Sequence, residues 1–527
     1  MSPKAEQVVA LVARSIALQQ QGQNEAALTL LDEAVALAPD FPVTLVKRGT
    51  LLMALARPRA ALADFDRSLA RQAVPHVLPL RDAALQGALQ ELEHQADDAP
   101  SCSECAALLE RLARNAEAEA KYRRAIELDA RSHAAWIGLG NLLLKTDRHA
   151  EALACYEAIL AVAPGDVVAL FNRGNALQKD CRFADALVSY AAAEKIQPDF
   201  AEIRMEQAHC HLARGDWQSG WPRFESRWQT RQLQGAMLQT SAPQWRGETL
   251  SQASLLLWAE QGLGDTLQFV RYLPMVAQRV GRVLLRVPAS LLSLCHEMAA
   301  SLPNVTVLAQ DDALPPHDAH CPLMSLPLVF GTAPYSIPQN VPYLHVPASY
   351  GQKWKDALGP RTKPHNQLRI AIVWSGGQRR LNNPTRDMPL AALLPLFDSV
   401  DAIDAQWLSL QKDVSDADAA ILAQHPKICR MEQGLDDFAD TAAILAQVDL
   451  LISVDTAVAH LAGAMGKPVW LVLRKAGEWR WMQESAATSW YPAHRLFRQT
   501  SHGQWADPVQ EMRQALRGLP QERTESR

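Results

Sequence analysis

The sequence predicts an α-helical solenoid followed by two parallel α/β domains. Two observations lead to this fold class. Residues recur with a period of 34 through much of the first 225 positions, and beyond position 253 short apolar runs alternate with amphipathic helices. A fixed period of this length is typical of stacked helix pairs, none of which can bury its apolar face alone. Alternating strands and helices are typical of parallel sheets covered by helices.

The 34-residue period is visible as pairs of identical residues. The pairs are Gly140 and Gly174, Asn141 and Asn175, Ala152 and Ala186, Tyr156 and Tyr190, and Pro164 and Pro198. The pattern resembles the tetratricopeptide repeat, which has a small residue where two helices approach closely, an aromatic residue on the second helix and a proline closing the unit. We expect five or six such units in residues 1–228, with an irregular unit or a long helix near residues 73–101.

Repeats of this kind usually present a concave groove to a peptide or protein. We therefore expect residues 1–228 to bind a protein acceptor or adaptor. The alternative is that the helices form only a dimerisation surface or a spacer.

Charge and hydropathy argue against other classes of partner. The formal net charge is −5 over 527 residues, and Lys and Arg form no stripe that would neutralise nucleic-acid phosphates. No apolar stretch reaches the roughly 18 residues needed to cross a bilayer, and the amino terminus has no apolar signal-peptide core. We expect a cytoplasmic protein with no nucleic acid partner and no membrane span. The eight cysteines suggest reduced thiols, and we expect no metal or cofactor.

The second half is divided by its alternating pattern. We expect a linker at 229–252, a first α/β domain at 253–347, a second at 365–505, and a terminal helix and tail at 506–527. The expected strands are 254–259, 282–287, 305–308, 369–374, 407–410, 449–454 and 468–473. The expected helices are 265–279, 349–358, 389–400, 437–447 and 456–465. Ligands of such domains bind at the carboxyl ends of the strands, which directs attention to the loops that follow them.

A glycine loop follows the first expected strand. It contains Gly262, Gly264 and Asp265 and leads directly into a helix. The glycines let the backbone approach a ligand closely. The loop is not the dinucleotide-binding fingerprint, because Leu267 stands where the third glycine is needed. Asp265 has an alternative role as a helix N-cap.

A second motif lies at the end of strand 450–454. Asp455, Thr456 and Ala457 begin a helix there, and His460 follows one turn later on the same face. The helix N-terminus and the Thr456 hydroxyl together suit a diphosphate. In the alternative interpretation, Asp455 caps the helix and His460 packs in the interior.

A third group is more basic. Ser375 follows an expected strand, and the loop after it carries Arg379, Arg380 and Arg386, while Gln411 ends another strand on the same rim. Small residues and guanidinium groups suit a phosphate-bearing donor. The alternative is a solvated basic loop.

Two of these motifs resemble a known family. Gly-Leu-Gly-Asp at 262–265 and Ser-Val-Asp-Thr-Ala-x-x-His-x-Ala-Gly-Ala-x-Gly-Lys-Pro at 453–468 are similar to the heptosyltransferase-type enzymes of glycosyltransferase family nine, over roughly residues 253–500. With the repeats in front, the chain resembles bacterial tetratricopeptide–glycosyltransferase fusions, a group that includes flagellin glycosyltransferases. Repeats ahead of a GT-B domain are also the plan of the O-GlcNAc transferases.

The resemblance implies a GT-B fold and an inverting, metal-independent sugar transfer. It assigns the general base to Asp265 and donor binding to Asp455, Thr456 and His460. The loop from 379 to 387 does not reproduce the basic donor loop of the heptosyltransferases, so heptose is not implied as the donor.

These observations lead to one leading hypothesis and two alternatives. The leading hypothesis is a glycosyltransferase that moves a sugar from a nucleotide sugar to a protein acceptor, with flagellin as a candidate. The first alternative keeps the chemistry and replaces the acceptor by a lipid or saccharide. The second is a non-catalytic repeat scaffold with a degenerate transferase domain.

Overall fold

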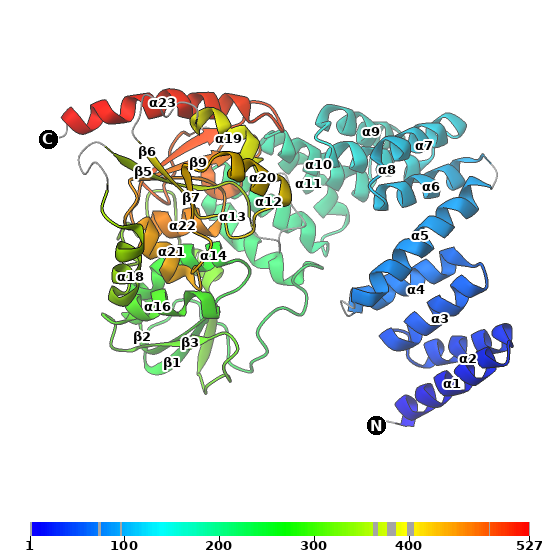
Figure 1. Ribbon diagram of the computed structural model, residues 1–527. Helices are drawn as coiled ribbons and strands as arrows, with labels where there is room; N and C mark the ends of the chain where they lie inside the picture. Colours follow the sequence, from blue (N-terminus) through cyan, green and yellow to red (C-terminus); the bar gives the residue numbers. More distant parts are fainter. Residues whose placement is uncertain are drawn as a thin grey trace. The chain divides into compact units, whose positions relative to one another are not determined.

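The computed structural model describes residues 3–71, 75–94, 97–361, 367–376, 386–397, 405–483 and 485–525 (Figure 1). The chain divides into two compact units, Met1–Arg173 and Gly174–Arg527. The first unit is entirely helical where it is described. The second contains further helices and two parallel sheets.

Unit 1 is a run of helices joined by short turns, as the repeat period predicts. The helices are α1 (Pro3–Gln20), α2 (Asn24–Leu37), α3 (Pro42–Ala54), α4 (Pro58–Arg71), η1 (Pro75–Val77), α5 (Leu78–Glu93), α6 (Ala99–Arg111), α7 (Asn115–Leu128), α8 (His133–Lys145), α9 (His149–Val162) and the start of α10 (Val167–Lys179). The pairs α1–α2, α3–α4, α6–α7 and α8–α9 pack against each other. Where the 34-residue period breaks, the chain forms η1 and the single helix α5, which packs between α4 and α6.

The glycine and tyrosine that recur after 34 residues contact each other in the helix pair α8–α9 and in the pair that follows it. A Cβ on Gly140 would lie 2.6 Å from Cε1 of Tyr156, so the two helices could not approach as they do. The Tyr156 hydroxyl donates to Oδ1 of Asn141, 2.8 Å away, which explains why asparagine follows the glycine. In unit 2, a Cβ on Gly174 would lie 2.4 Å from the Tyr190 ring, the same contact one period later.

Unit 2 begins with the last helices of the repeat pattern. These are the end of α10, α11 (Phe183–Ile196), α12 (Ala201–Ala213), α13 (Trp217–Phe224) and η2 (Glu225–Gln229). Their aromatic side chains pack against the α/β part: Trp217 stacks on Trp490 at 5.1 Å between ring centroids, and Trp221 meets Trp479 edge-on at 5.3 Å. The compact unit therefore includes helices that precede the expected linker at 229–252.

The first sheet has the order β3-β2-β1-β4, with all strands parallel. Its strands are β1 (Leu250–Trp258), β2 (Val280–Val287), β3 (Val305–Ala309) and β4 (Ala319–Pro322). The accompanying helices are α14 (Leu263–Phe269), η3 (Val270–Tyr272), α15 (Leu273–Ala277), η4 (Ala289–Leu291), α16 (Leu292–Ala299), η5 (Leu323–Ser325) and α17 (Leu326–Val329). The apolar run Leu255–Leu257 of β1 is fully buried, because neighbours flank it on both sides.

The second sheet has the order β10-β9-β8-β5-β6-β7 and is also parallel. Its strands are β5 (Leu368–Val373), β6 (Ala405–Ser409), β7 (Ile428–Arg430), β8 (Leu450–Val454), β9 (Val469–Leu473) and β10 (His494–Arg498). The helices of this part are α18 (Ala348–Leu358), α19 (Leu390–Phe397), α20 (Asp416–Gln424), α21 (Phe438–Leu445), α22 (Ala457–Ala464), η9 (Trp479–Trp481) and α23 (Ala506–Glu525).

Some elements differ from the expectation. The expected helix at 265–279 is interrupted by η3, because Pro274 lacks the backbone N–H needed to continue α14 and lies instead in the first turn of the short α15. The strands β4, β7 and β10 were not expected. They are short or interrupted by charged and histidine residues, which hide the apolar run of a buried strand.

In each sheet the strand order reverses at one point, and three loops lie beside these two points. In the first sheet β1 lies between β2 and β4, and the glycine loop follows β1. In the second sheet β5 lies between β8 and β6, so the loops after β5 and β8 flank the reversal. Open α/β sheets bind ligands at this position.

Candidate functional site

The glycine loop joins β1 to α14. Gln261 has a positive φ of 59°, and Gly262 is the N-cap residue of α14. Asp265 stands at the third helical position, where its Oδ2 accepts the backbone N–H of Gly262 at 2.9 Å. The carboxylate therefore helps to cap the helix from its third position, and its Oδ1 is bound by Arg480.

A buried ion pair fixes the start of this loop. Both carboxylate oxygens of Glu260 accept from Arg227, at 2.9 and 3.1 Å, and Oε1 also accepts the Met324 backbone N–H. Burial raises the pKa of Glu260 although Arg227 acts to lower it. Arg227 lies in η2, so η2 fixes the position of Glu260 at the start of the glycine loop.

The second motif lies where β8 meets α22. Thr456 is the N-cap residue, but its hydroxyl does not cap the helix and instead shares a hydrogen bond of 3.1 Å with Ser453 Oγ. Oδ1 of Asp455 lies 3.8 Å from Nε2 of His460. Both side chains are largely buried, with exposed fractions of 12% and 7%.

The helices α14 and α22 pack on each other (Figure 1). A Cβ on Gly264 would lie 2.8 Å from Cδ2 of His460 and 3.6 Å from the Cα of Ala457. Gly264 is therefore required for close packing. This contact brings the first motif and the second motif into one place.

His460 is a buried neutral imidazole. Its ring stacks on Trp481, and its Nδ1 shares a hydrogen bond of 3.0 Å with the Tyr491 hydroxyl. Burial lowers the pKa of His460 to about 3, although the nearby carboxylate of Asp455 acts in the opposite direction. A neutral imidazole can donate or accept a hydrogen bond but adds no charge to the site.

Two arginines connect the motifs through a chain of alternating charges. Nη2 of Arg386 lies 3.4 Å from Oδ2 of Asp455 and also binds Oε1 of Glu478. The other oxygen of Glu478 lies 3.6 Å from Nη1 of Arg480. Arg480 in turn binds Asp265 through Nη2. The chain therefore runs from Asp265 to Asp455.

This arrangement keeps Asp455 ionised. Burial acts to raise the pKa of Asp455, but the positive charges of Arg386 and Arg480 bring that pKa below the usual range. Asp455 is therefore a buried carboxylate whose partners are mainly guanidinium groups, which places positive charge at the carboxyl end of β8.

Ser375 and Gln411 form a separate pair at the ends of β5 and β6. Oε1 of Gln411 accepts the backbone N–H of Ser375 at 3.0 Å, and its Nε2 donates to Ser375 Oγ at 2.9 Å. Gln411 therefore shapes the loop after β5. The loop returns through Asp387, which accepts the Gly376 N–H at 2.8 Å and places Arg386 in the charged chain. Arg379 and Arg380 lie outside the described residues.

Four further residues of the site were not predicted from the sequence: Glu478, Arg480, Gln268 and Tyr491. Arg480 lies in η9, after the carboxyl end of β9, and its Nε donates to Oε1 of Gln268 at 2.6 Å. Ligands of open α/β sheets bind at the carboxyl ends of the strands, and β9 ends shortly before η9. The segment between β9 and η9 is irregular, so no helical or strand periodicity in the sequence indicated that its charged residues belong to the site.

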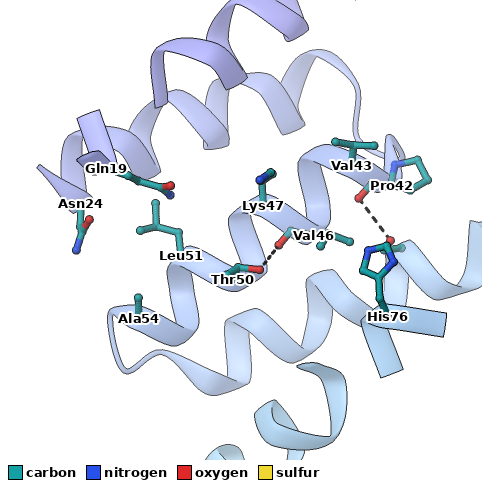
Figure 2. A pocket seen from close by; sticks show the side chains of 11 residues that line it. Gln19, Asn24, Pro42, Val43, Val46, Lys47, Thr50, Leu51, Ala54 and His76 are labelled. Carbon is teal, nitrogen blue, oxygen red and sulfur yellow. Dashed lines mark hydrogen bonds between the residues drawn. The ribbon is translucent and has the colours of Figure 1, made fainter. Parts of the chain in front are cut away.

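A groove lies on unit 1, with a volume of about 630 Å³ (Figure 2). Its lining includes Gln19, Val43, Val46, Lys47, Leu51 and His76, from α1, α3 and η1. Val43 is 56% exposed and the charged Lys47 stands one helical turn later. The groove therefore offers both apolar contact and positive charge.

The described helices include none that is long and apolar enough to span a bilayer.

Comparison with known proteins identifies the repeats. The tetratricopeptide repeat model matches residues 106–167, which confirms the prediction of repeats of this type in that part of the chain. The curated relative Protein FlbA of Caulobacter vibrioides is 24% identical over 357 residues, which cover 60% of this chain and 55% of FlbA. The chain thus spans about half the length of this relative.

Several solved repeat structures are also similar. A tetratricopeptide repeat protein from Parabacteroides merdae is 16% identical, with a TM-score of 0.27, over 42% of this chain and 91% of that chain. YrrB, described as a TPR protein with an unusual peptide-binding site, is 15% identical, with a TM-score of 0.23, over 39% of this chain and 92% of its own.

Proposed function

We propose that the α/β half is a glycosyltransferase of the GT-B type, which moves a sugar from a nucleotide sugar to a protein acceptor in the cytoplasm. The observation that carries the proposal is the contact between α14 and α22. It brings Asp265 of the first α/β part within one chain of ion pairs of Asp455 in the second. A transferase needs a base for the acceptor and positive charge for the leaving group in one site.

The proposed step is a single displacement. The acceptor hydroxyl oxygen attacks the anomeric carbon and gives its proton to the Asp265 carboxylate. The bond between the anomeric carbon and the phosphate oxygen breaks, and its electron pair leaves with the nucleoside diphosphate. Arg386 and Arg480 offset the charge that develops on this leaving group. Inversion follows because the attack comes from the face opposite the leaving group.

The donor is proposed to lie across the ends of β5, β6 and β8. Ser375 and Gln411 form the wall on the β5 side, and the amino end of α22 supplies backbone N–H groups at Thr456 and Ala457. The neutral ring of His460 holds this end of α22 in place through its hydrogen bond with the Tyr491 hydroxyl.

The acceptor is proposed to be a polypeptide held by the repeats, and flagellin is the candidate drawn from the family resemblance. Support comes from the tetratricopeptide repeats themselves, because such arrays form extended protein-binding surfaces. The apolar and basic lining of the groove on unit 1 suits an extended segment with apolar and acidic side chains.

One observation favours a second function, that of a non-catalytic scaffold. The two carboxylate oxygens of Asp265 already accept from the Gly262 N–H and from Arg480. These contacts are what a non-catalytic scaffold would retain for stability alone.

Replacement of Asp265 separates the two functions. We expect Asp265→Asn to lower the rate of transfer from a nucleotide sugar by about 10²–10⁴-fold, because the general base is lost, with donor affinity retained. Initial rates and donor binding are measured on the full-length protein with a panel of nucleotide sugars. Asp311→Asn, at an exposed position of the same α/β part, is the matched control. An unchanged rate in Asp265→Asn refutes the assignment of the base.

A further inference from the structure

Little open space remains between Arg386 and Asp455. The cavity lined by these residues, Arg474 and Glu478 has a volume of about 10 Å³. A volume of this size holds about one water molecule. A diphosphate can therefore enter only if a side chain moves.

Glu478 is the side chain that fills the place between the two arginines. Its Oε1 binds Arg386, and its Oε2 lies 3.6 Å from Arg480. Two guanidinium groups on either side of one carboxylate are also the arrangement that binds a phosphoryl group, because both anions accept from planar N–H donors.

The Glu478 side chain has room to move out of this position, whereas the body of the Arg480 side chain is held by its neighbours. Glu478 is 24% exposed and precedes η9 in a segment without regular structure. Arg480 is 8% exposed, lies over the Trp479 ring at 4.4 Å and is tied by Nε to Gln268. Its terminal Nη atoms can exchange one anion for another while the rest of the side chain stays in position.

We propose that Glu478 occupies the position of the donor diphosphate between Arg386 and Arg480, and that donor binding displaces it and draws Arg480 away from Asp265. This inference rests on the proposed function and adds a positioning role for two residues. Arg480 holds the Asp265 carboxylate until the donor is bound. Once Arg480 turns to the diphosphate, Oδ1 of Asp265 loses its partner and is free to accept a hydrogen bond from the acceptor hydroxyl. The base is thereby released only when there is a donor to attack.

Binding of inorganic pyrophosphate to the full-length protein tests this inference. We expect Glu478→Gln to bind pyrophosphate about tenfold more tightly than the parent by calorimetry, because the competing carboxylate is gone. We expect Arg480→Gln to bind it about tenfold more weakly. Glu511→Gln, which removes an exposed carboxylate paired with Arg495 at 3.2 Å, is the matched control and should leave the affinity unchanged. Damage to the fold cannot tighten binding, so Glu478→Gln remains informative even if Arg480→Gln is unstable.

A crystal structure with pyrophosphate separates displacement from a simple effect of charge. We expect the anion between Arg386 and Arg480, with the Glu478 carboxylate turned out. An anion bound elsewhere, Glu478 still in place, or unchanged affinity in Glu478→Gln would overturn the inference. If nucleotide sugars are turned over while these variants bind pyrophosphate like the parent, the inference is wrong and the transferase remains. If pyrophosphate behaves as expected but no sugar is transferred, the anion site remains and the transferase is refuted.

Discussion

Buried histidine His460 links the site to the pH dependence of stability. The unfolded chain protonates this side chain near pH 6.5, whereas burial brings the pKa in the folded state to about 3. Between these values the unfolded state binds a proton that the folded state does not. Stability is therefore lost as the pH falls below 6.5, by about 2 kcal/mol between pH 7 and 5 for one such histidine. The lowered pKa of Asp455 keeps that carboxylate ionised throughout this range.

We expect His460→Gln to remove this share of the pH dependence. The free energy of unfolding is measured in urea at pH 7 and pH 5 by tryptophan fluorescence, which reports mainly on unit 2 because nearly all tryptophans lie there. His345→Gln, at an exposed position, serves as the matched control. An identical loss of stability on acidification in His460→Gln and in the parent would contradict a neutral buried imidazole.

Single residues also show what the sequence could predict about the site. Asp265, Asp455 and His460 were predicted from their positions after strands, and the structure brings them together. Their partner Arg480 was not predicted, because it lies 215 residues from Asp265 and in an irregular segment. The sequence indicates which side chains end strands, but the pairing of charges across two sheets depends on how those sheets pack. The roles of these residues in binding and transfer remain predictions.

Among the elements, the contact of α14 with α22 decides the geometry of the site. Gly264→Ala introduces a Cβ that meets the His460 ring at 2.8 Å, and that ring cannot retreat because Trp481 and Tyr491 hold it. We expect unit 2 to lose about 1–3 kcal/mol of stability through overpacking, together with donor affinity. The measurements are urea unfolding and calorimetric titration.

The matched control for this substitution is Gly518→Ala in α23. A Cβ there meets no atom within 4 Å, and alanine favours a helix interior, so stability should be equal or slightly higher. Equal stability of Gly264→Ala and the parent would show that α14 and α22 are not tightly packed.

Elements differed in how well the sequence predicted them. The strands β1, β5, β8 and β9 are long apolar runs and were expected close to their observed positions. The strand β10 was not, because its histidine and arginine residues mask the pattern, although β10 lies at the edge of the sheet beside β9. The helices α12 and α13 followed from the repeat period, but no periodicity shows that Trp217 and Trp221 pack on Trp490 and Trp479.

At the scale of the whole molecule, the proposed function requires the repeats to hold the acceptor. We expect Val43→Glu, in the groove on unit 1, to reduce sugar transfer to a protein acceptor at least tenfold, because a buried interface does not tolerate an unpaired charge. Turnover of the nucleotide sugar in the absence of acceptor should be unchanged. Val162→Glu, which is 74% exposed on α9 and outside the groove, is the matched control. An equal loss of sugar transfer in both variants, or no loss in either, would show that the groove does not hold the acceptor.

The central claim is that the chain transfers a sugar to a protein. The most direct test is the intact mass of flagellin after co-expression with the full-length protein and with Asp265→Asn, in cells that make nucleotide sugars. We predict that flagellin gains the mass of one or more glycosyl residues with the parent protein and none with the variant. Flagellin of unchanged mass with the parent, together with no turnover of any nucleotide sugar by the purified protein, would contradict it.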